Sequence, residues 1–378
     1  MDKVVVVMPS YNEKDNISLM IAELVDKEFP KITGAQMHLL VVDDKSPDGT
    51  GGVVREAMKT RNNLHLLEGE KQGLGWAYIR GFKYATLELK ADAVMEMDAD
   101  FQHPPRFVKP MVEAYLGGAQ YVIGSRYIKG GSIPKEWALQ RKLVSFFGNL
   151  FIRLVLLKPK LHDLTTGFRL TKVRGVLDKI DLDHLMEPKR FAYKVDLLYQ
   201  SVKNSQKTVE VPLEFASRTK EISKFNPKEM ISTFKVAIIL GIKDKSRFIK
   251  FGTVGFIGYL INAITLKLMT SANAPGLLAW SIPVELSIIS NFVLNNAWTF
   301  KEEKITGIIQ TFKKFLTFNG TSMGALLIQT VAGIIGDMVF GKGARQILLP
   351  FIILFMVLPY NYFMYNRVIW KTKRAGVK

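Results

Sequence analysis

The chain has 378 residues, of which 48% are hydrophobic, 52 are lysine or arginine, 34 are aspartate or glutamate and none is cysteine. This length suffices for two domains, the apolar fraction argues against intrinsic disorder, and the lack of cysteine excludes disulfide scaffolds, cysteine-ligated metal centres and thiol catalysis. The formal net charge of +18 points to an anionic partner: a nucleotide, a nucleic acid or a membrane surface.

Short apolar runs alternate with amphipathic segments in the N-terminal third of the chain. The pattern predicts strands at residues 3–8, 38–42, 64–68, 93–97 and 121–124, and helices at residues 14–28, 50–60, 73–89 and 105–116. Continuous apolar strands separated by helices are typical of a parallel sheet that is covered on both faces. Ligands of such a sheet bind beyond the carboxyl ends of its strands.

Polar residues cluster after three of the predicted strands, at residues 9–13, 43–50 and 98–103. Asp98 and Asp100 directly follow the fourth strand, and Gln102 comes two residues later. Their oxygen atoms suit a hard divalent cation such as Mg or Mn that keeps open positions for a diphosphate. Glu13 and Asp44, at neighbouring strand ends, are candidates to accept hydrogen bonds from a base or ribose.

Other nucleotide and metal motifs fail in this sequence. No phosphate-binding G-x-x-x-x-G-K-[ST] string occurs, and the Gly-Leu-Gly segment 73–75 is followed by Tyr78 where the dinucleotide fingerprint needs a small residue. A calcium loop that begins at Asp44 would have Arg55 where a bidentate glutamate is required. Asp48 is therefore expected to form a turn or cap a helix.

The segment 133–157 mixes aromatic and aliphatic side chains with lysine and arginine at near-helical spacing. This pattern predicts a helix, with a break near Gly148, that lies in the membrane interface. Residues 230–242 form a candidate second helix of this kind. The alternative is that both segments pack onto the sheet as ordinary core.

Charged residues are sparse beyond residue 245, where 133 residues hold 14 lysines and arginines and 4 acidic residues. Membrane spans are predicted at residues 248–269, 277–300, 315–340 and 347–370. Basic residues concentrate before the first span, between the second and third, and after the fourth, which predicts that the N-terminal domain and both termini are cytoplasmic. Polar residues of the second span are expected to face other helices or a cavity: Glu285, Ser290, Asn291, Asn295 and Asn296.

The strings VVVVMPSYNE, VVDDKSPDGT, MDADFQHPP, IGSRYIKGG and TTGFRL resemble the polyprenyl-phosphate (dolichyl-phosphate) mannose synthases of glycosyltransferase family 2 over residues 3–230. The string VELSIISNFVLNNAWTF resembles a GtrA-like membrane domain. The resemblance implies an α/β GT-A fold, a nucleotide-sugar-binding mixed sheet with helices on both faces, plus an all-α domain of four transmembrane helices. The implied domains are a cytoplasmic glycosyltransferase domain at 1–228, an interfacial helix and linker at 229–245, and the membrane domain at 246–378.

The resemblance also implies roles for individual positions. The implied nucleotide-binding residues are Pro9 and Tyr11, which shape the base pocket, with Glu13, Val42 and Asp44. The implied metal and donor segment is Asp98, Ala99, Asp100 and Gln102, with the two aspartates and Gln102 as metal ligands. Arg126, Arg141 and Ser145 are implied to receive the lipid phosphate, and Lys194 to contact the donor. A basic loop implied to close over the donor contains Arg218, Lys220 and Lys224, with Lys220 and Glu221 in place of the family's arginine and glycine.

The function that these residues predict is inverting, metal-dependent transfer of mannose from GDP-mannose to dolichyl or polyprenyl phosphate, giving dolichyl phosphate mannose and GDP. Asp98, Asp100, Arg126 and Arg141 are the predicted catalytic residues. A lipid phosphate is already anionic near neutral pH, so it needs aligning cations rather than a general base. The alternatives are glucose transfer from UDP-glucose and a non-catalytic sensor or lipid-sugar translocation component. Nucleic acid is not an expected partner, because much of the positive charge lies beside the predicted spans.

Overall fold

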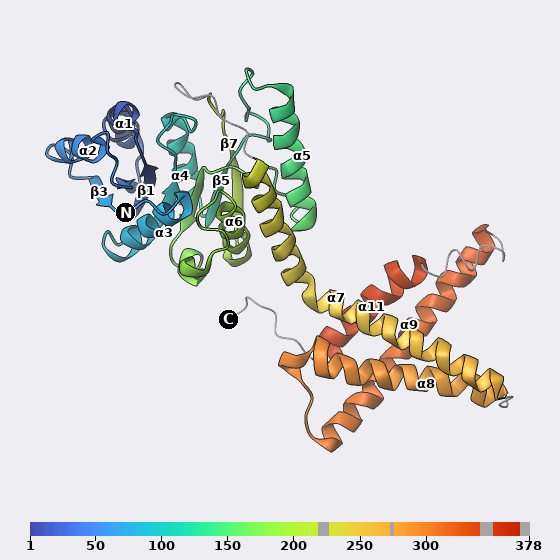
Figure 1. The fold of residues 1–378 in the computed structure, drawn as a ribbon. Coiled ribbons are helices and arrows are strands. Elements are labelled where there is room, and N and C mark those ends of the chain that lie inside the picture. The colour runs from blue at the N-terminus through green and yellow to red at the C-terminus, as the bar shows by residue number, and fades with distance from the viewer. Residues whose placement is uncertain (218–226, 273–275, 341–350, 371–378) are drawn as a thin grey trace. The chain divides into compact units, whose positions relative to one another are not determined.

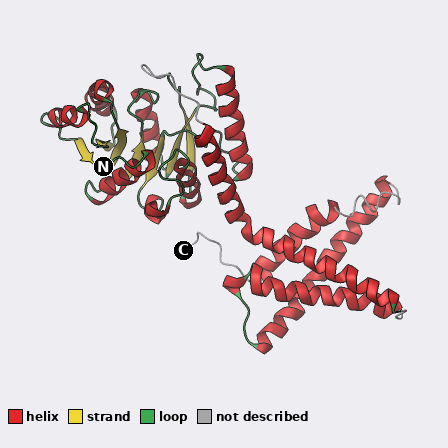
Figure 2. Cartoon of the chain, viewed as in Figure 1, coloured by secondary structure: helices red, strands yellow, loops and turns green. Residues whose placement is uncertain are grey.

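The structure is a computed structural model that describes residues 1–217, 227–272, 276–340 and 351–370. Backbone contacts divide the chain into two compact units, residues 1–241 and 242–378. All strands of the described residues belong to the first unit, and the second unit consists of helices and their connections (Figure 2). The predicted change of architecture along the chain is therefore present in the structure.

The first unit is built on a seven-stranded sheet in the order β3-β2-β1-β4-β6-β5-β7 (Figure 1). The strands are β1 (Asp2–Ser10), β2 (Ala35–Asp43), β3 (Leu64–Glu68), β4 (Ala93–Glu96), β5 (Tyr121–Ser125), β6 (Arg169–Lys172) and β7 (Thr208–Pro212). Strand β6 is antiparallel to its neighbours β4 and β5, and the other pairings are parallel. The mixed sheet agrees with the predicted fold class, and the strands predicted from the N-terminal third are confirmed.

Helices cover both faces of this sheet. They are α1 (Lys14–Ile21), α2 (Thr50–Met58), α3 (Leu74–Leu87), α4 (Val108–Leu116), α5 (Leu139–Val155) and α6 (Tyr193–Asn204). Alternate side chains of β1 point to opposite faces, so Val4 and Val6 pack in one buried cluster with α1 and α4, whereas Val5 and Val7 pack in another with α3 and α6. Burial on both faces explains why β1 is a continuous apolar run in the sequence.

Gly81 allows α3 to lie close against the sheet. A β-carbon at Gly81 would come within 2.4 Å of Val7 Cγ1 and 2.9 Å of Val42 Cγ2. We therefore expect Gly81→Ala to lower the free energy of unfolding by about 1–3 kcal/mol, because both contacts are in the core. The matched control is Gly52→Ala in α2, where nothing lies within 4 Å of the added carbon. Thermal unfolding of the purified proteins, followed by circular dichroism, measures the difference; equal midpoints for the two variants would contradict this account.

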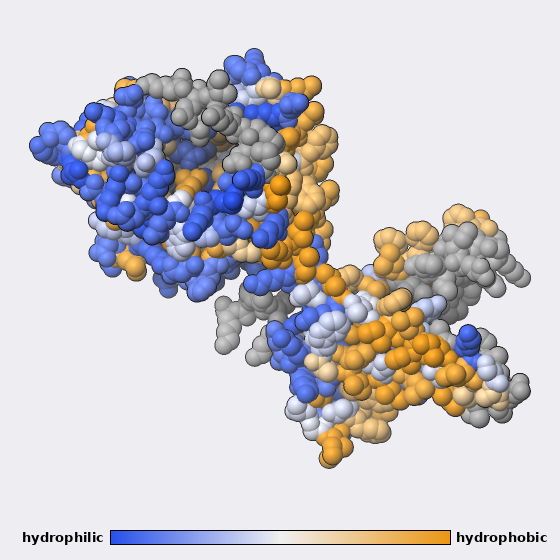
Figure 3. All heavy atoms as spheres, viewed as in Figure 1, coloured by the Kyte–Doolittle hydropathy of each residue, from blue (hydrophilic) through white to orange (hydrophobic). Residues whose placement is uncertain are grey.

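Helix α5 lies within the segment predicted to be interfacial. It runs without interruption through Gly148, so the predicted break is wrong: the helix only begins later than expected, at Leu139, beyond Pro134. One face packs on the unit through Ile152, but many large apolar side chains of α5 and its ends are exposed: Leu139, Leu143, Val144, Phe146, Phe147, Phe151, Leu154 and Leu157. Figure 3 shows an orange band along this edge of the unit. Such an exposed apolar face indicates an interaction surface rather than a helix of the core.

The described part of the second unit is mainly helical. Helix α7 (Pro227–Ser271) enters it from the first unit and is followed by α8 (Gly276–Leu294), α9 (Ile308–Phe340) and α11 (Leu358–Met364). Among the described residues, one helical stretch, Lys245–Met269, is long and apolar enough to cross a membrane. Helices also occupy the described parts of the other three predicted spans, while residues 347–350 of the fourth lie outside the described residues.

An aromatic cluster joins the helices of the second unit. The Phe300 and Trp370 rings stack with centroids 4.3 Å apart, and Asn296 Oδ1 accepts hydrogen bonds from Trp370 Nε1 at 3.0 Å and from the backbone N–H of Ile305 at 2.8 Å. Asn295 is also buried, so the inward orientation expected for polar residues of the second predicted span holds for this end of it. It does not hold for Glu285, which is exposed on α8.

Candidate active site

A cleft of about 420 Å³ lies at one edge of the sheet. Its walls come from the segments that follow β1, β2, β3, β4, β5 and β7, from the start of α3, and from the segments that precede β6 and α6. Parallel strands bring their carboxyl ends to one edge, and the antiparallel β6 brings its amino end there, so segments far apart in the sequence meet. The cleft is lined by Pro9, Ser10, Tyr11, Glu13, Asp44, Lys71, Gly73, Leu74, Ala77, Asp98, Ala99, Asp100, Gln102, His103, Arg126, Thr165, Thr166, Gly167, Phe191 and Phe215.

Most of the residues predicted for the donor site meet in this cleft: Pro9, Tyr11, Glu13, Asp44, Asp98, Ala99, Asp100, Gln102 and Arg126. Lys71 was not predicted, and its Nζ lies 3.2 Å from the centre of the Tyr11 ring, a cation–π contact. Lys71 lies in the polar segment 68–72 at the end of β3, and none of the predicted strand-end clusters included it. The structure therefore places a cation beside Tyr11 that was not among the predicted site residues.

Two aspartates in the loop after β2, Asp44 and Asp48, hold this part of the cleft in place through their contacts. Asp44 pairs with the guanidinium of Arg80, and burial raises the pKa of the Asp44 carboxyl although Arg80 opposes this shift. Asp48 accepts hydrogen bonds from the backbone N–H groups of Lys14 at 3.0 Å and Thr50 at 2.9 Å. Asp48 is thus a turn residue as predicted, and it fixes the loops after β1 and β2 side by side.

The Asp98–Gln102 segment forms a tight turn after β4. Asp98 Oδ1 accepts a hydrogen bond from the Tyr78 hydroxyl at 2.8 Å, and Asp100 Oδ1 accepts one from the backbone N–H of Gln102 at 3.1 Å. Phe101 has a φ of +61°, a conformation that bulky residues rarely adopt. This backbone reversal returns the chain toward the cleft, so both aspartates and Gln102 line it.

Two buried residues, His103 and Lys194, contact Asp98 in this turn. The Nδ1 atom of His103 accepts a hydrogen bond from the backbone N–H of Asp98 at 3.1 Å, and burial lowers the pKa of His103 to about 4, so the ring is neutral at neutral pH. Lys194, the predicted donor lysine, does not line the cleft: its buried Nζ lies 3.6 Å from Asp98 Oδ1. A β-carbon on Gly167 would meet that Nζ at 2.2 Å, so the absence of a side chain there leaves Lys194 its space.

Arg126, which also lines the cleft, forms a buried ion pair with Asp163. Asp163 Oδ2 accepts hydrogen bonds from the backbone N–H of Arg126 at 3.0 Å and from its Nε at 2.7 Å, and Oδ1 accepts one from Nη2 at 2.8 Å. Thr165 Oγ1 accepts a further bond from Nη2 at 2.7 Å. Burial alone would raise the pKa of Asp163, but the Arg126 charge and these hydrogen bonds lower it below its usual value. The pair therefore stays ionised and holds the guanidinium in one orientation.

A second cavity of about 250 Å³ shares Arg126, Thr165 and Phe191 with the cleft. Its other walls come from α5 and the first turns of α7: Val144, Ser145, Gly148, Asn149, Ile152, Glu229, Met230, Thr233 and Phe234. Ser145 lies here and not in the cleft, with its Oγ 2.6 Å from the Tyr127 hydroxyl. Arg141 lines neither space; its guanidinium lies 3.8 Å from the centre of the Trp137 ring.

Val42, which was predicted to bind the nucleotide, does not line the cleft. Its side chain is fully buried on β2 beneath α3, facing Gly81, because the alternation of β2 directs it into the core. The predicted basic loop residues Arg218, Lys220 and Lys224 lie outside the described residues.

The cleft fits a divalent cation that binds together with a diphosphate. No group of three or more histidine or acidic residues within the described ranges is arranged to hold a metal by itself. Asp98 and Asp100 supply carboxylate oxygens and Gln102 an amide oxygen on the same wall, which are hard ligands with an incomplete shell. This donor set suits a metal whose remaining positions are filled by substrate oxygens.

Comparison with known proteins decides the family. The glycosyl transferase family 2 description matches residues 5–178, and the GtrA/DPMS transmembrane domain matches residues 250–370. The dolichol-phosphate mannosyltransferase of Pyrococcus furiosus is 32% identical over 318 residues, which cover 83% of this chain and 85% of that protein. The chain belongs to the polyprenyl-phosphate mannose synthases of glycosyltransferase family 2. It carries a GtrA-like membrane domain and is a membrane protein.

Two further relatives match a smaller share of this glycosyltransferase. The polyprenol monophosphomannose synthase of Mycolicibacterium smegmatis is 36% identical over 250 residues, which cover 65% of this chain and 90% of that protein. The undecaprenyl-phosphate mannosyltransferase of Micrococcus luteus is 36% identical over 225 residues, which cover 59% and 88%. The family assignment inferred from the sequence strings is confirmed.

Proposed function

We propose that this glycosyltransferase transfers mannose from GDP-mannose to the phosphate of a dolichyl or other polyprenyl lipid, with inversion at the sugar carbon, releasing GDP. The observation that carries the proposal is that Arg126 lines both the strand-end cleft and the cavity beside α5. A donor in the first space and a lipid phosphate in the second would meet at this arginine. The names of the three relatives, all mannose-transferring enzymes of polyprenyl lipids, support the same reaction.

For the donor, Pro9, Tyr11 and Glu13 would bind the nucleoside, with Asp44 near the ribose. Asp98, Asp100 and Gln102 would hold Mg or Mn, which when bound supplies neutralisation of the diphosphate charge. Lys194 supports this wall through Asp98, since its ammonium is too deeply buried to reach the cleft lining. Arg218, Lys220 and Lys224 are proposed to close over the diphosphate as further cations.

For the acceptor, no general base is required, because a phosphate monoester carries its nucleophilic oxygen already ionised. Arg126 uses Nε and Nη2 for Asp163 and Thr165, which leaves Nη1 without a hydrogen-bond partner among the described residues. We assign Nη1, Ser145 and Arg141 to the lipid phosphate. Aligning this anion on the face of the sugar opposite the diphosphate would give an inverted product.

The membrane arrangement is part of the proposal. Residues 1–228 form the cytoplasmic catalytic domain, 229–245 the interfacial linker and 246–378 a domain of four transmembrane helices with both termini cytoplasmic. The exposed apolar face of α5 and the adjoining Ile231, Ile238 and Ile239 of α7 would enter the membrane interface. This would bring the second cavity to the depth of lipid phosphates.

Transfer assays with the purified full-length protein test the function. Labelled GDP-mannose and labelled UDP-glucose are supplied in parallel with dolichyl phosphate and Mn, and EDTA serves as the metal control. We expect mannosyl lipid, with the label lost on mild acid hydrolysis as free mannose, and no product in EDTA. Glucosyl lipid would keep the mechanism and change the donor. Metal-dependent nucleotide binding without transfer from either donor would favour the sensor or translocation alternative.

A further inference from the structure

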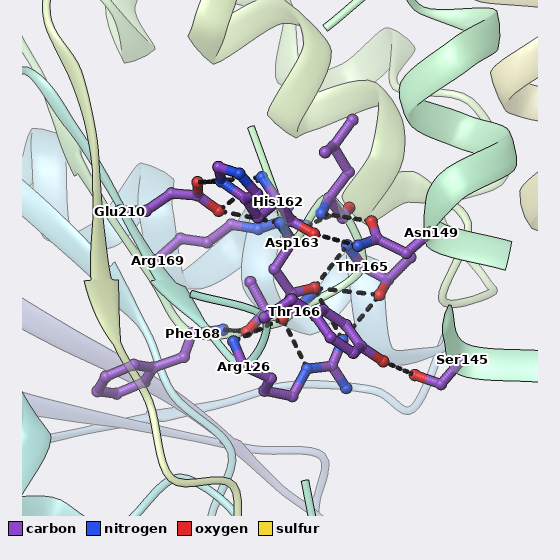
Figure 4. Close-up of polar contacts among 12 residues, drawn as sticks. Arg126, Ser145, Asn149, His162, Asp163, Thr165, Thr166, Phe168, Arg169 and Glu210 are labelled. Atoms are coloured by element: carbon purple, nitrogen blue, oxygen red, sulfur yellow. Dashed lines mark hydrogen bonds and ion pairs between the residues drawn. The ribbon is translucent and has the colours of Figure 1, made fainter. Parts of the chain in front are cut away.

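The loop between α5 and β6 connects the apolar helix to the active-site arginine. In the middle of this loop, Glu210 on β7 accepts hydrogen bonds from the backbone N–H groups of His162, at 2.9 Å, and Asp163, at 2.9 Å. Next to them, the carbonyl of Leu164 accepts a hydrogen bond from Nη2 of Arg169 on β6 at 3.2 Å. The loop is therefore anchored to two strands of the sheet (Figure 4).

Asn149 is the contact between this loop and α5. Its Nδ2 donates to the carbonyl of His162, and its Oδ1 accepts from the backbone N–H of Leu164 at 2.9 Å. Asn149 is 3% exposed, and these two hydrogen bonds use both ends of its amide. These hydrogen bonds are made to the residues immediately before and after Asp163. Asn149 therefore fixes the backbone on both sides of the aspartate that is ion-paired with Arg126. Figure 4 shows Asn149 reaching from α5 to the loop, with Arg126 approaching Asp163 from the other side.

We propose that Asn149 is a positioning residue for the acceptor arginine: it transmits the position of α5 through Asp163 to Arg126. The inference rests on the proposed function in one respect, the assignment of Arg126 to the lipid phosphate. Because the amide of Asn149 is already engaged by the loop, it acts on the acceptor through Arg126 rather than by direct contact. Seating of α5 at the membrane surface then sets the orientation of Nη1 toward the phosphate.

The kinetic test compares Asn149→Ala and Asn149→Leu with Asn204→Ala in the full-length protein. Asn204 is a matched control, since it also donates from a helix to a loop carbonyl, that of Val176 at 3.2 Å, away from both cavities. We expect both Asn149 variants to raise the KM for dolichyl phosphate about tenfold, with the KM for GDP-mannose within about twofold, because one charge-assisted contact to the acceptor is misplaced. Asn204→Ala should change neither constant.

A double-mutant cycle tests the route through Arg126. In an Arg126→Ala background, Asn149→Leu should cause no further change in acceptor KM, because the group it positions is gone. Leucine has the same branched arrangement of side-chain heavy atoms as asparagine but cannot form hydrogen bonds, so a loss seen with alanine but not leucine would assign Asn149 to packing and overturn the proposal. Equal effects on donor and acceptor KM, or additive effects in the cycle, would also overturn it.

Hydrogen exchange provides a readout that does not depend on transfer activity. The backbone N–H of Arg126 is bonded to Asp163 Oδ2, so Asn149→Leu should speed exchange at Arg126 and at residues 163–166, while Asn204→Ala should not. Unchanged exchange at Arg126 would overturn the inference. If exchange responds as expected but the wild type makes no mannosyl lipid, the proposed function fails and the structural coupling stands.

Discussion

Asp100→Asn is expected to reduce mannosyl transfer by at least about 100-fold, the scale of losing one group that stabilises charge developing in the transition state. The amide keeps the acceptor that binds the Gln102 N–H, which Asp100 Oδ1 accepts at 3.1 Å, so the turn should survive. What the variant loses is one negative charge on the wall proposed to hold the metal. Initial rates at saturating donor and acceptor, measured with Mn and with Mg, give the effect.

The matched control for Asp100 is Asp178→Asn. Asp178 is also an aspartate whose Oδ1 accepts one backbone hydrogen bond, from Gly175 at 2.8 Å, but it does not line the cleft. Its substitution should leave transfer within about twofold, because a surface change of this kind alters stability little. If Asp100→Asn retained more than a third of the wild-type rate in both metals, Asp100 would not be a metal ligand and the assignment of the Asp98–Gln102 turn would fail.

Arg126→Ala is expected to cost both activity and stability. It leaves Asp163, which is fully buried, without its guanidinium, and breaking a buried pair in this way costs about 3–5 kcal/mol. For a domain of this size the midpoint of thermal unfolding should fall by on the order of 10 °C. Arg141→Ala, by contrast, should lower acceptor affinity with little change in the midpoint, because its stacking on Trp137 is worth about 1 kcal/mol.

The stability deficit of Arg126→Ala should depend on pH. In the wild type the pKa of Asp163 is lowered, so the stability it contributes is present above its ordinary pKa and is lost only as the pH falls through the lower folded value. Without Arg126, burial raises the pKa of Asp163 instead, and protonation then relieves the unpaired charge. The difference in unfolding midpoint between wild type and variant should therefore shrink from pH 7.5 to pH 5.

The double variant Arg126→Ala/Asp163→Ala separates folding from function. Removing both charges should recover most of the lost unfolding midpoint, since no unpaired ion remains in the interior. Transfer should stay low, because the proposed acceptor arginine is absent. Recovery of transfer together with the midpoint would show that Arg126 serves the fold alone and would contradict its role in binding the lipid phosphate.

Local sequence determined the scaffold and most of the donor wall. Apolar runs such as 3–8 form strands because both faces of the sheet are buried, and the carboxyl ends of parallel strands meet at one edge whatever the details of packing. The position of Asp98, Asp100 and Gln102 directly after a strand was therefore enough to predict that they line the cleft. Tyr11 and Glu13 reached the same cleft for the same reason.

Tertiary structure decided which side chains face the cleft and which other residues pair with those side chains. Val42 is two residues from Asp44, yet it still lies within β2, where its side chain is buried under α3, whereas Asp44 lies beyond the strand end. Asp163 stands 37 residues from Arg126, and nothing in its local pattern distinguishes a clamp from a solvated aspartate. The pairing exists because β5 and the loop before β6 converge on one edge of the sheet, where desolvation makes an opposite charge necessary. Periodicity reports burial, but the partner of a buried charge is set by contacts between distant segments.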